Sequence, residues 1–259
     1  MAFFPVLSSA ALARPLETLH PALWRAHQLA RPGAAVVASG YPELDAELPG
    51  GGWPSGALTE LLLPHAGVGE LRLLAPVLAT LQQQQRSVMW FDPPATPCAW
   101  ALSALGIDLQ RLVLVRARSG LKHRARALLP AADVLWALEQ ALKSGHLGAV
   151  LAWLPARLPA DALRRLQLAA QAHEGPAFLL RDAQMRTQPS AAPLRLLLAS
   201  AGPDLLRVAL LKRRGPPLAL PLTLALPPVL SAPVSRHALA RPAPAAAAAG
   251  SLLRHAAGG

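Results

Sequence analysis

A glycine-containing loop at residues 63–71 stands where an α/β protein normally holds a phosphate group. It joins an expected strand to an expected helix, and the first N–H groups of a helix can bind an anion. The loop contains Gly67 and Gly69, but Glu70 stands where a phosphate-binding lysine is needed and Leu71 where a magnesium-binding hydroxyl is needed. Because a carboxylate repels a triphosphate and leucine cannot ligate Mg²⁺, the loop has the frame of a nucleotide site without its chemistry. The residues of this degenerate nucleotide loop are Pro64, Gly67, Gly69 and Glu70.

Two further positions that nucleotide hydrolysis requires are also altered. An ATPase of this kind needs an acid after the second core strand, to position water, and another at the end of a later strand, near Mg²⁺. Asp92 follows the expected strand at 88–91 but no glutamate comes after it, and the expected strand at 149–154 ends in Ala-Trp-Leu. The loop and these two positions all lack a group that nucleotide hydrolysis needs. Together they predict a binding scaffold that is not an enzyme, with no catalytic residue and no cofactor.

Residue spacing does not favour other kinds of catalytic or metal site. The single cysteine, Cys98, excludes a disulfide framework and a cysteine-based zinc site. The eight histidines show no paired spacing typical of metal ligands, and no G-x-S-x-G elbow is present. We therefore expect no metal site.

Basic residues gather in two places that suit contact with a polyanion or an acidic protein. The net charge is +11, and from Arg186 onward nine Lys and Arg face one acid, Asp204. One group follows an apolar strand and consists of Lys212, Arg213 and Arg214. The other lies after the apolar run 112–115 and consists of Arg116, Arg118, Lys122, Arg124 and Arg126. Both groups are candidate DNA- or partner-binding residues, and the alternative is that each is a solvated surface segment.

Strands alternate with helices from residue 58 to residue 180. The expected strands are apolar throughout rather than alternating, which is typical of a parallel sheet covered by helices on both faces. The last third of the chain then runs from strand to strand. We therefore predict an α/β fold with a mostly parallel central sheet flanked by helices and an antiparallel C-terminal extension.

Composition divides the chain into three parts. Residues 1–33 form an N-terminal leader and helix, residues 34–230 a core domain, and residues 231–259 an Ala/Pro/Arg tail of disordered type. No Lys or Arg precedes Arg14 and Pro5 interrupts the first apolar run, so we expect no signal peptide. The longest uncharged run, 215–235, is broken by prolines, so we expect no membrane helix and a cytoplasmic protein.

Several segments resemble a known family once they are taken together. Residues 40–63 are similar to the segment that leads into the phosphate loop of RecA-like recombinases. The runs GGGWPSGALTELLLPHAGVGEL, LWALEQALKSGHLGAVLAWL and LLKRRG resemble the ImuA family. The resemblance implies a degenerate RecA-like core and a non-catalytic accessory role in SOS-induced error-prone translesion DNA synthesis. It also implies an ImuB-like polymerase-related partner and an error-prone polymerase subunit, with RecA and DNA as further candidate partners.

Two alternatives remain open at this point. Residues 58–181 also resemble the SulA-type division inhibitors, which share such a core and bind the tubulin-like division GTPase. The glycine-rich lead-in at 40–56 and the basic end at 186–214 favour ImuA over this reading, because the inhibitors are shorter. The third hypothesis, a divergent RecA-like ATPase, is weakest because of Glu70 and Trp153.

Overall fold

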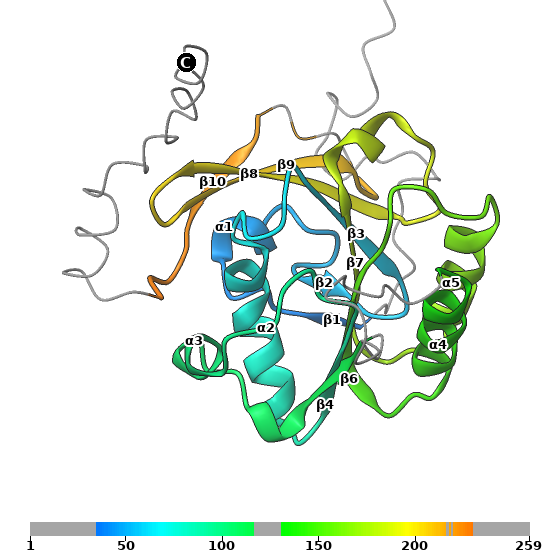
Figure 1. The fold of residues 1–259 in the computed structure, drawn as a ribbon. Coiled ribbons are helices and arrows are strands. Elements are labelled where there is room, and N and C mark those ends of the chain that lie inside the picture. The colour runs from blue at the N-terminus through cyan, green and yellow to red at the C-terminus, as the bar shows by residue number, and fades with distance from the viewer. Residues whose placement is uncertain (1–34, 117–130, 216–217, 219, 230–259) are drawn as a thin grey trace, which may run out of the picture. The chain divides into compact units, whose positions relative to one another are not determined.

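Eight strands form one sheet at the centre of the part of the chain that the structure describes (Figure 1). The structure is a computed structural model and describes residues 35–116, 131–215, 218 and 220–229. In chain order the strands are β3 (Leu58–Leu63), β4 (Ser87–Phe91), β5 (Leu112–Val115), β6 (Leu147–Trp153), β7 (Ala177–Asp182), β8 (Leu194–Gly202), β9 (Leu205–Lys212) and β10 (Leu222–Ala225). They lie in the order β10-β9-β8-β3-β7-β6-β4-β5. All of them belong to one compact unit, Met1–Pro227.

Six neighbouring strands, from β8 to β5 in that order, run parallel. Strand β9 then pairs antiparallel with β8, and β10 antiparallel with β9. Every residue of β3 is buried, as expected for a central strand with apolar side chains on both faces. The predicted α/β fold with a mostly parallel sheet and an antiparallel C-terminal extension is confirmed.

Helices cover the two faces of the parallel part of the sheet, and on one side the helical layer continues to the antiparallel strands, where α1 (Pro42–Asp45) contacts β10 (Figure 1). On one face lie α1, α2 (Glu70–Gln83) and α3 (Ala99–Ala104), and on the other α4 (Ala131–Lys143) and α5 (Ala162–Ala170). Two short 3-10 turns, η3 (Leu109–Arg111) and η4 (Ala183–Thr187), lie in connections between strands. Two separate apolar clusters result, because the sheet lies between the helices of the first face and those of the second.

The glycine-rich stretch before β3 is more ordered than its sequence indicates. It contains α1 and a two-residue strand, β2 (Trp53–Pro54), which pairs antiparallel with β1 (Val36–Val37). A Cβ at Gly52 would lie 2.5 Å from the carbonyl oxygen of Val37, so this close approach requires glycine. Trp53 is fully buried and packs edge-on against Phe178, with 5.2 Å between ring centroids. The stretch is therefore part of the core and not a surface turn.

The predicted domain boundaries are not decided by the described residues. The leader at 1–33 and the tail at 231–259 lie outside them, so the division around a core at 34–230 stays a prediction. In the described part of the chain, no helix is long and apolar enough to cross a membrane.

His173 is a buried imidazole between α5 and β7. It is 2% exposed, and neither ring nitrogen has a hydrogen-bond partner. Burial, with a smaller contribution from the charge of Arg86, lowers the pKa of His173 to about 4. The folded protein thus binds this proton less readily than the unfolded chain does, whose histidine titrates near pH 6.5.

We predict that His173 makes the free energy of unfolding fall as the pH falls from 6.5 toward 4. Its contribution is fully present above pH 6.5, and at pH 5 about 2 kcal/mol of it is lost. Urea denaturation of the wild type and of His173→Asn at pH 7.5 and pH 5 measures the difference. The exposed His146, changed to Asn, is the matched surface control for the loss of an imidazole. An equal pH dependence in wild type and His173→Asn would contradict the prediction.

Candidate functional site

The carboxyl ends of β3, β4, β6 and β7 meet at one edge of the sheet and surround a pocket. Its volume is about 330 Å³, and its walls are largely apolar. The polar side chains that line it are His65, Asp92, Arg181 and Asp182. In open α/β sheets ligands bind at this edge, so the pocket is the candidate site on grounds of topology.

The loop after β3 satisfies its own N–H groups with a carboxylate. The Glu70 side chain is buried at the start of α2, and its two oxygens accept hydrogen bonds from Gly67 N at 2.8 Å and Gly69 N at 3.1 Å. Both glycines have positive φ, +85° and +123°. The groups that would hold a phosphate are therefore engaged by the chain itself. Of the predicted loop residues, Pro64 lines the pocket, and the other three form this internal contact.

The two other altered positions also lie at the pocket. Asp92 directly follows β4 and has φ +47°, a left-handed conformation that non-glycine residues seldom adopt, and its N–H donates to the carbonyl of Val115. Trp153 ends β6 and packs against Trp90, with 5.8 Å between ring centroids. The wall that would carry an acid near Mg²⁺ is thus aromatic. Among the described residues, no three His, Cys, Asp or Glu side chains gather as a metal site.

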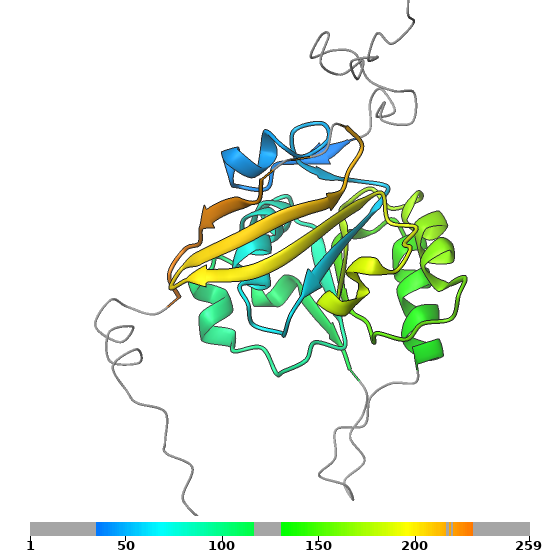
Figure 2. The same cartoon turned by 90° about the horizontal axis from the view of Figure 1, so that it is seen from above.

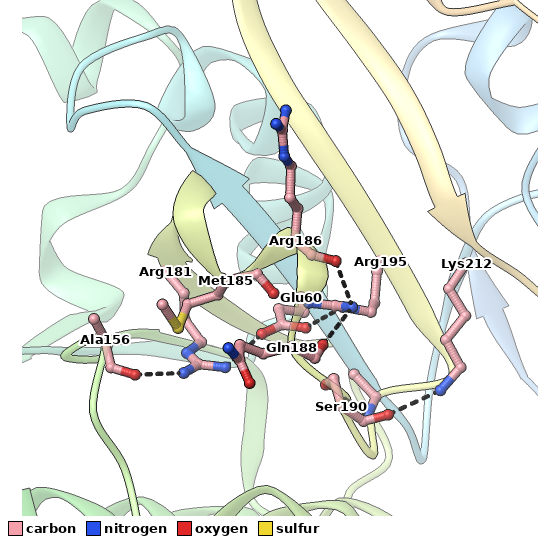
Figure 3. A network of polar contacts seen from close by, with 10 residues as sticks. Glu60, Ala156, Arg181, Met185, Arg186, Gln188, Ser190, Arg195 and Lys212 are labelled. Carbon is pink, nitrogen blue, oxygen red and sulfur yellow. Dashed lines mark hydrogen bonds and ion pairs between the residues drawn. The ribbon is translucent and has the colours of Figure 1, made fainter.

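A buried ionic group lies beside the pocket and joins three strands (Figure 3). Glu60, on β3, is fully buried and accepts from Arg181 of β7 at 2.8 Å and from Arg195 of β8 at 2.5 Å. Both arginines are less than one-tenth exposed. Each guanidinium therefore keeps its charge in the interior only because the carboxylate and nearby carbonyls replace water.

The arginines of this group also hold the chain connections at the carboxyl edge. Arg181 donates to the carbonyl of Ala156 at 2.9 Å. Arg195 donates to the carbonyl oxygens of Met185 at 2.8 Å and Gln188 at 3.1 Å (Figure 3). The connection that contains η4 is thereby fastened over β3. Arg181 also lines the pocket, so the same group shapes the wall of the candidate site.

The described members of the two predicted basic groups do not come together. Lys212 donates to the carbonyl of Ser190 at 2.9 Å, and its partial burial, then the charge of Arg195, lower the pKa of Lys212. Arg213 forms an ion pair with Glu47 at 2.7 Å, whereas Arg214 is exposed. Strand β5, which Arg116 follows, is at one end of the strand order, and β9 is next to the other end.

The second basic group is mostly beyond the described residues. Arg116 donates to Thr96 Oγ1 at 2.9 Å. The other four of its members, Arg118, Lys122, Arg124 and Arg126, lie outside the part of the chain that the structure describes. A role for either group in binding stays a prediction.

The sequence analysis missed the buried ionic group. Its signal was a glutamate in the middle of the otherwise apolar run Leu58–Leu63, where an unpaired charge would be costly. Nothing in the spacing of Glu60, Arg181 and Arg195 identifies the partners, because the three residues meet only through the strand order.

Comparison with known proteins identifies similar sequences. The model of the family "Cell division inhibitor SulA" matches residues 56–177. The SulA protein of Edwardsiella piscicida is 33% identical over 121 residues, which cover 47% of this chain and 65% of that protein. The SulA protein of Yersinia enterocolitica is 29% identical over 127 residues, 49% of this chain and 68% of that protein. The chain thus spans about two thirds of the length of these relatives.

These matches correct the resemblance to ImuA. The matched family is SulA, so the predicted translesion accessory role is wrong. The predicted partners are wrong with it: the ImuB-like protein, the polymerase subunit, RecA and DNA. The runs quoted for ImuA consist largely of the turn, strand, loop and helix that the fold itself requires, so they did not separate two families. The matched proteins carry the name of an inhibitor, and the prediction of a non-enzymatic protein is confirmed.

We predict that Glu60→Gln lowers the free energy of unfolding by about 3–5 kcal/mol, because two arginines then keep buried charges without a counter-charge. Glu139 of α4 is the matched control, since it also contacts two cations, Lys143 and Arg165, but at the surface. Glu139→Gln should cause a far smaller loss, as solvent screens the pairs. Chemical denaturation measures both variants, and equal losses would contradict the prediction.

We predict that Glu70→Ala loosens the loop before α2, because the N–H groups of Gly67 and Gly69 lose their acceptor. The expected cost is about 1–2 kcal/mol of unfolding free energy, with faster hydrogen exchange at those two amides. Glu70→Gln keeps one acceptor oxygen and should lie between wild type and Glu70→Ala. Unchanged exchange at Gly67 and Gly69 in Glu70→Ala would argue against this role.

Proposed function

We propose that this protein inhibits cell division in the manner of the SulA family, by binding a protein and without chemistry of its own. The partner we propose is the tubulin-like division GTPase, FtsZ. The observation that carries the proposal is the family match over residues 56–177. That region includes β3 to β6 and all of α2 to α5, and therefore both helix-covered faces of the sheet.

The site supports a binding role in place of hydrolysis. Glu70 engages Gly67 and Gly69, and Trp153 stands at the strand end where an acid would be required. The sheet edge where a RecA-like protein would bind a nucleotide is here occupied by the chain's own carboxylate and by an aromatic wall. This arrangement is consistent with a degenerate RecA-like core, in which the loop after the central strand keeps its position, and we include that fold in the proposal.

Exposed aromatic side chains within the matched region offer anchors for a protein partner. Trp100 of α3 is 68% exposed and Trp136 of α4 is 63% exposed. Leu168 of α5 is 58% exposed, on a helix that an ion pair between Arg165 and Glu139 joins to α4. Large exposed apolar side chains of this kind are enriched at protein interfaces.

We include in the proposal induction in the SOS response and a cytoplasmic location, where the division GTPase assembles.

We predict that expression of the full chain in a rod-shaped bacterium produces filaments several times longer than normal cells. The purified protein should also reduce GTP-dependent assembly of the division GTPase, measured by light scattering, in proportion to its concentration. Trp136→Ala should weaken both effects, because an interface anchor is lost while the fold is kept. Arg164→Ala, on the exposed side of α5, serves as a surface control.

Normal cell length at high levels of folded protein, together with unaltered assembly of the division GTPase, would overturn the proposed function. Circular dichroism of the purified variants establishes that each one is folded. Loss of activity in both variants would remove Trp136 as a specific anchor and leave the inhibition itself standing.

A further inference from the structure

One face of the antiparallel extension is open. The inward side chains of β8, β9 and β10, among them Leu196, Leu206 and Leu224, join the apolar cluster that includes α1 and α2. On the opposite face no helix of the described residues lies over these strands, and Figure 2 shows them in front of α2. The strand pairing and the burial of the side chains together define which residues lie on this open face. They are Leu197, Ala199, Leu205, Arg207, Ala209, Leu211, Lys212, Thr223 and Ala225.

Apolar side chains are exposed on this face beside a cation. Leu205 is 39% exposed and Leu211 is 42% exposed. Arg207 lies between Ala199 of β8 and Thr223 of β10 in the register of the sheet, and it is exposed. A sheet normally buries one face and places polar side chains on the other, so leucines on the outer face indicate a surface that is covered in a complex.

The charge around the open face is positive. Exposed Arg186 lies on the η4 connection that borders it, Lys212 lies at the end of β9, and exposed Arg214 follows β9. Two of the nearby acids have basic partners: Asp204, in the turn between β8 and β9, pairs with Arg72, and Glu60 pairs with Arg181 and Arg195. Asp182 accepts a hydrogen bond from the backbone N–H of Gln184 at the start of η4. An occupant that complements this face must carry negative charge and apolar side chains.

The chain's own remaining segments do not have that chemistry. Residues 1–34, 117–130 and 230–259 contain ten Lys and Arg and a single acid, Glu17. A second copy of the chain is equally unsuitable, because its net charge is +11. Single-stranded nucleic acid is disfavoured because residues 194–229 contain no aromatic side chain on which bases could stack. The exposed Leu205 and Leu211 would add nothing to contact with a phosphate backbone.

We propose that the open face of β8, β9 and β10 docks an acidic segment of a protein partner, with leucine-type side chains packing on Leu205 and Leu211 and carboxylates paired with Arg207 and its basic neighbours. The strands that form it, residues 194–225, lie outside the region that matches the SulA family. The face is therefore a second interaction surface, and it goes beyond the proposed inhibition of division.

The test uses the full chain and a fluorescein-labelled peptide in which leucine recurs every third or fourth residue among Asp and Glu. Fluorescence anisotropy at physiological salt measures the Kd. The double variant Arg207→Glu with Leu211→Ser should bind the peptide about tenfold more weakly or worse. The matched control, Arg157→Glu in the connection after β6 with Leu114→Ser on β5, where Leu114 is 41% exposed, makes the same changes in charge and apolar area away from the open face and should bind as the wild type does.

Two further probes decide the kind of occupant. A peptide of equal charge with serine in place of leucine should bind more weakly, since the proposal requires apolar contacts. A single-stranded DNA oligonucleotide of equal charge should bind no more tightly than that serine peptide. The proposal is overturned if the leucine peptide does not bind, if both double variants weaken it equally, or if the DNA binds more tightly than the leucine peptide and loses affinity in Arg207→Glu with Leu211→Ser.

Discussion

The buried contact of Glu60 with Arg181 and Arg195 is the constraint on which the other features depend. It joins β7, β3 and β8, which are adjacent strands, and so ties the parallel part of the sheet to the strand that begins the antiparallel extension. Taking three charges out of water is costly, and the attraction offsets that cost only while all partners are in place. The same guanidiniums hold the carbonyls of Ala156, Met185 and Gln188, so the group also sets the shape of the carboxyl edge.

A second carboxylate, that of Glu70, plays a similar part in the loop after β3. It engages Gly67 and Gly69, the N–H groups that a phosphate would need, and Asp92 and Trp153 complete an edge without hydrolytic chemistry. The parts of the described chain that remain available to bind a partner lie on its surface. Exposed aromatic residues lie in the region that matches a family of division inhibitors, and a basic apolar face lies on the extension beyond it. Under the proposed function, the protein acts through the partners that cover those surfaces.

The burial of some side chains differs from what the local sequence indicates. Trp136 lies in an apolar run, which favours burial, but it is 63% exposed, because Leu135, Leu138 and Leu142 face the sheet on the same helix and Trp136 faces away from it. Gln82 begins a polar run of four glutamines, which favours an exposed helix end, but its amide is buried and exchanges two hydrogen bonds of 2.8 Å with the backbone of Asp108. The resemblance to the ImuA family was misleading because the quoted segments reflect a fold that related families share.

The local sequence pattern alone determined which segments become strands and helices, and in what order they follow one another along the chain. Continuous apolar runs such as residues 149–154, and helical spacing such as that of residues 131–143, indicate the periodicity of each element and its burial, and both are properties of neighbours along the chain. The loss of nucleotide chemistry at Glu70 was also readable, since the loop is a single segment. The partners of Glu60, the outer face of Arg207 and the exposure of Trp136 were decided only by the tertiary structure. These depend on which strands and helices become neighbours, and the pairing energy of residues more than a hundred positions apart leaves no periodic signal in the sequence.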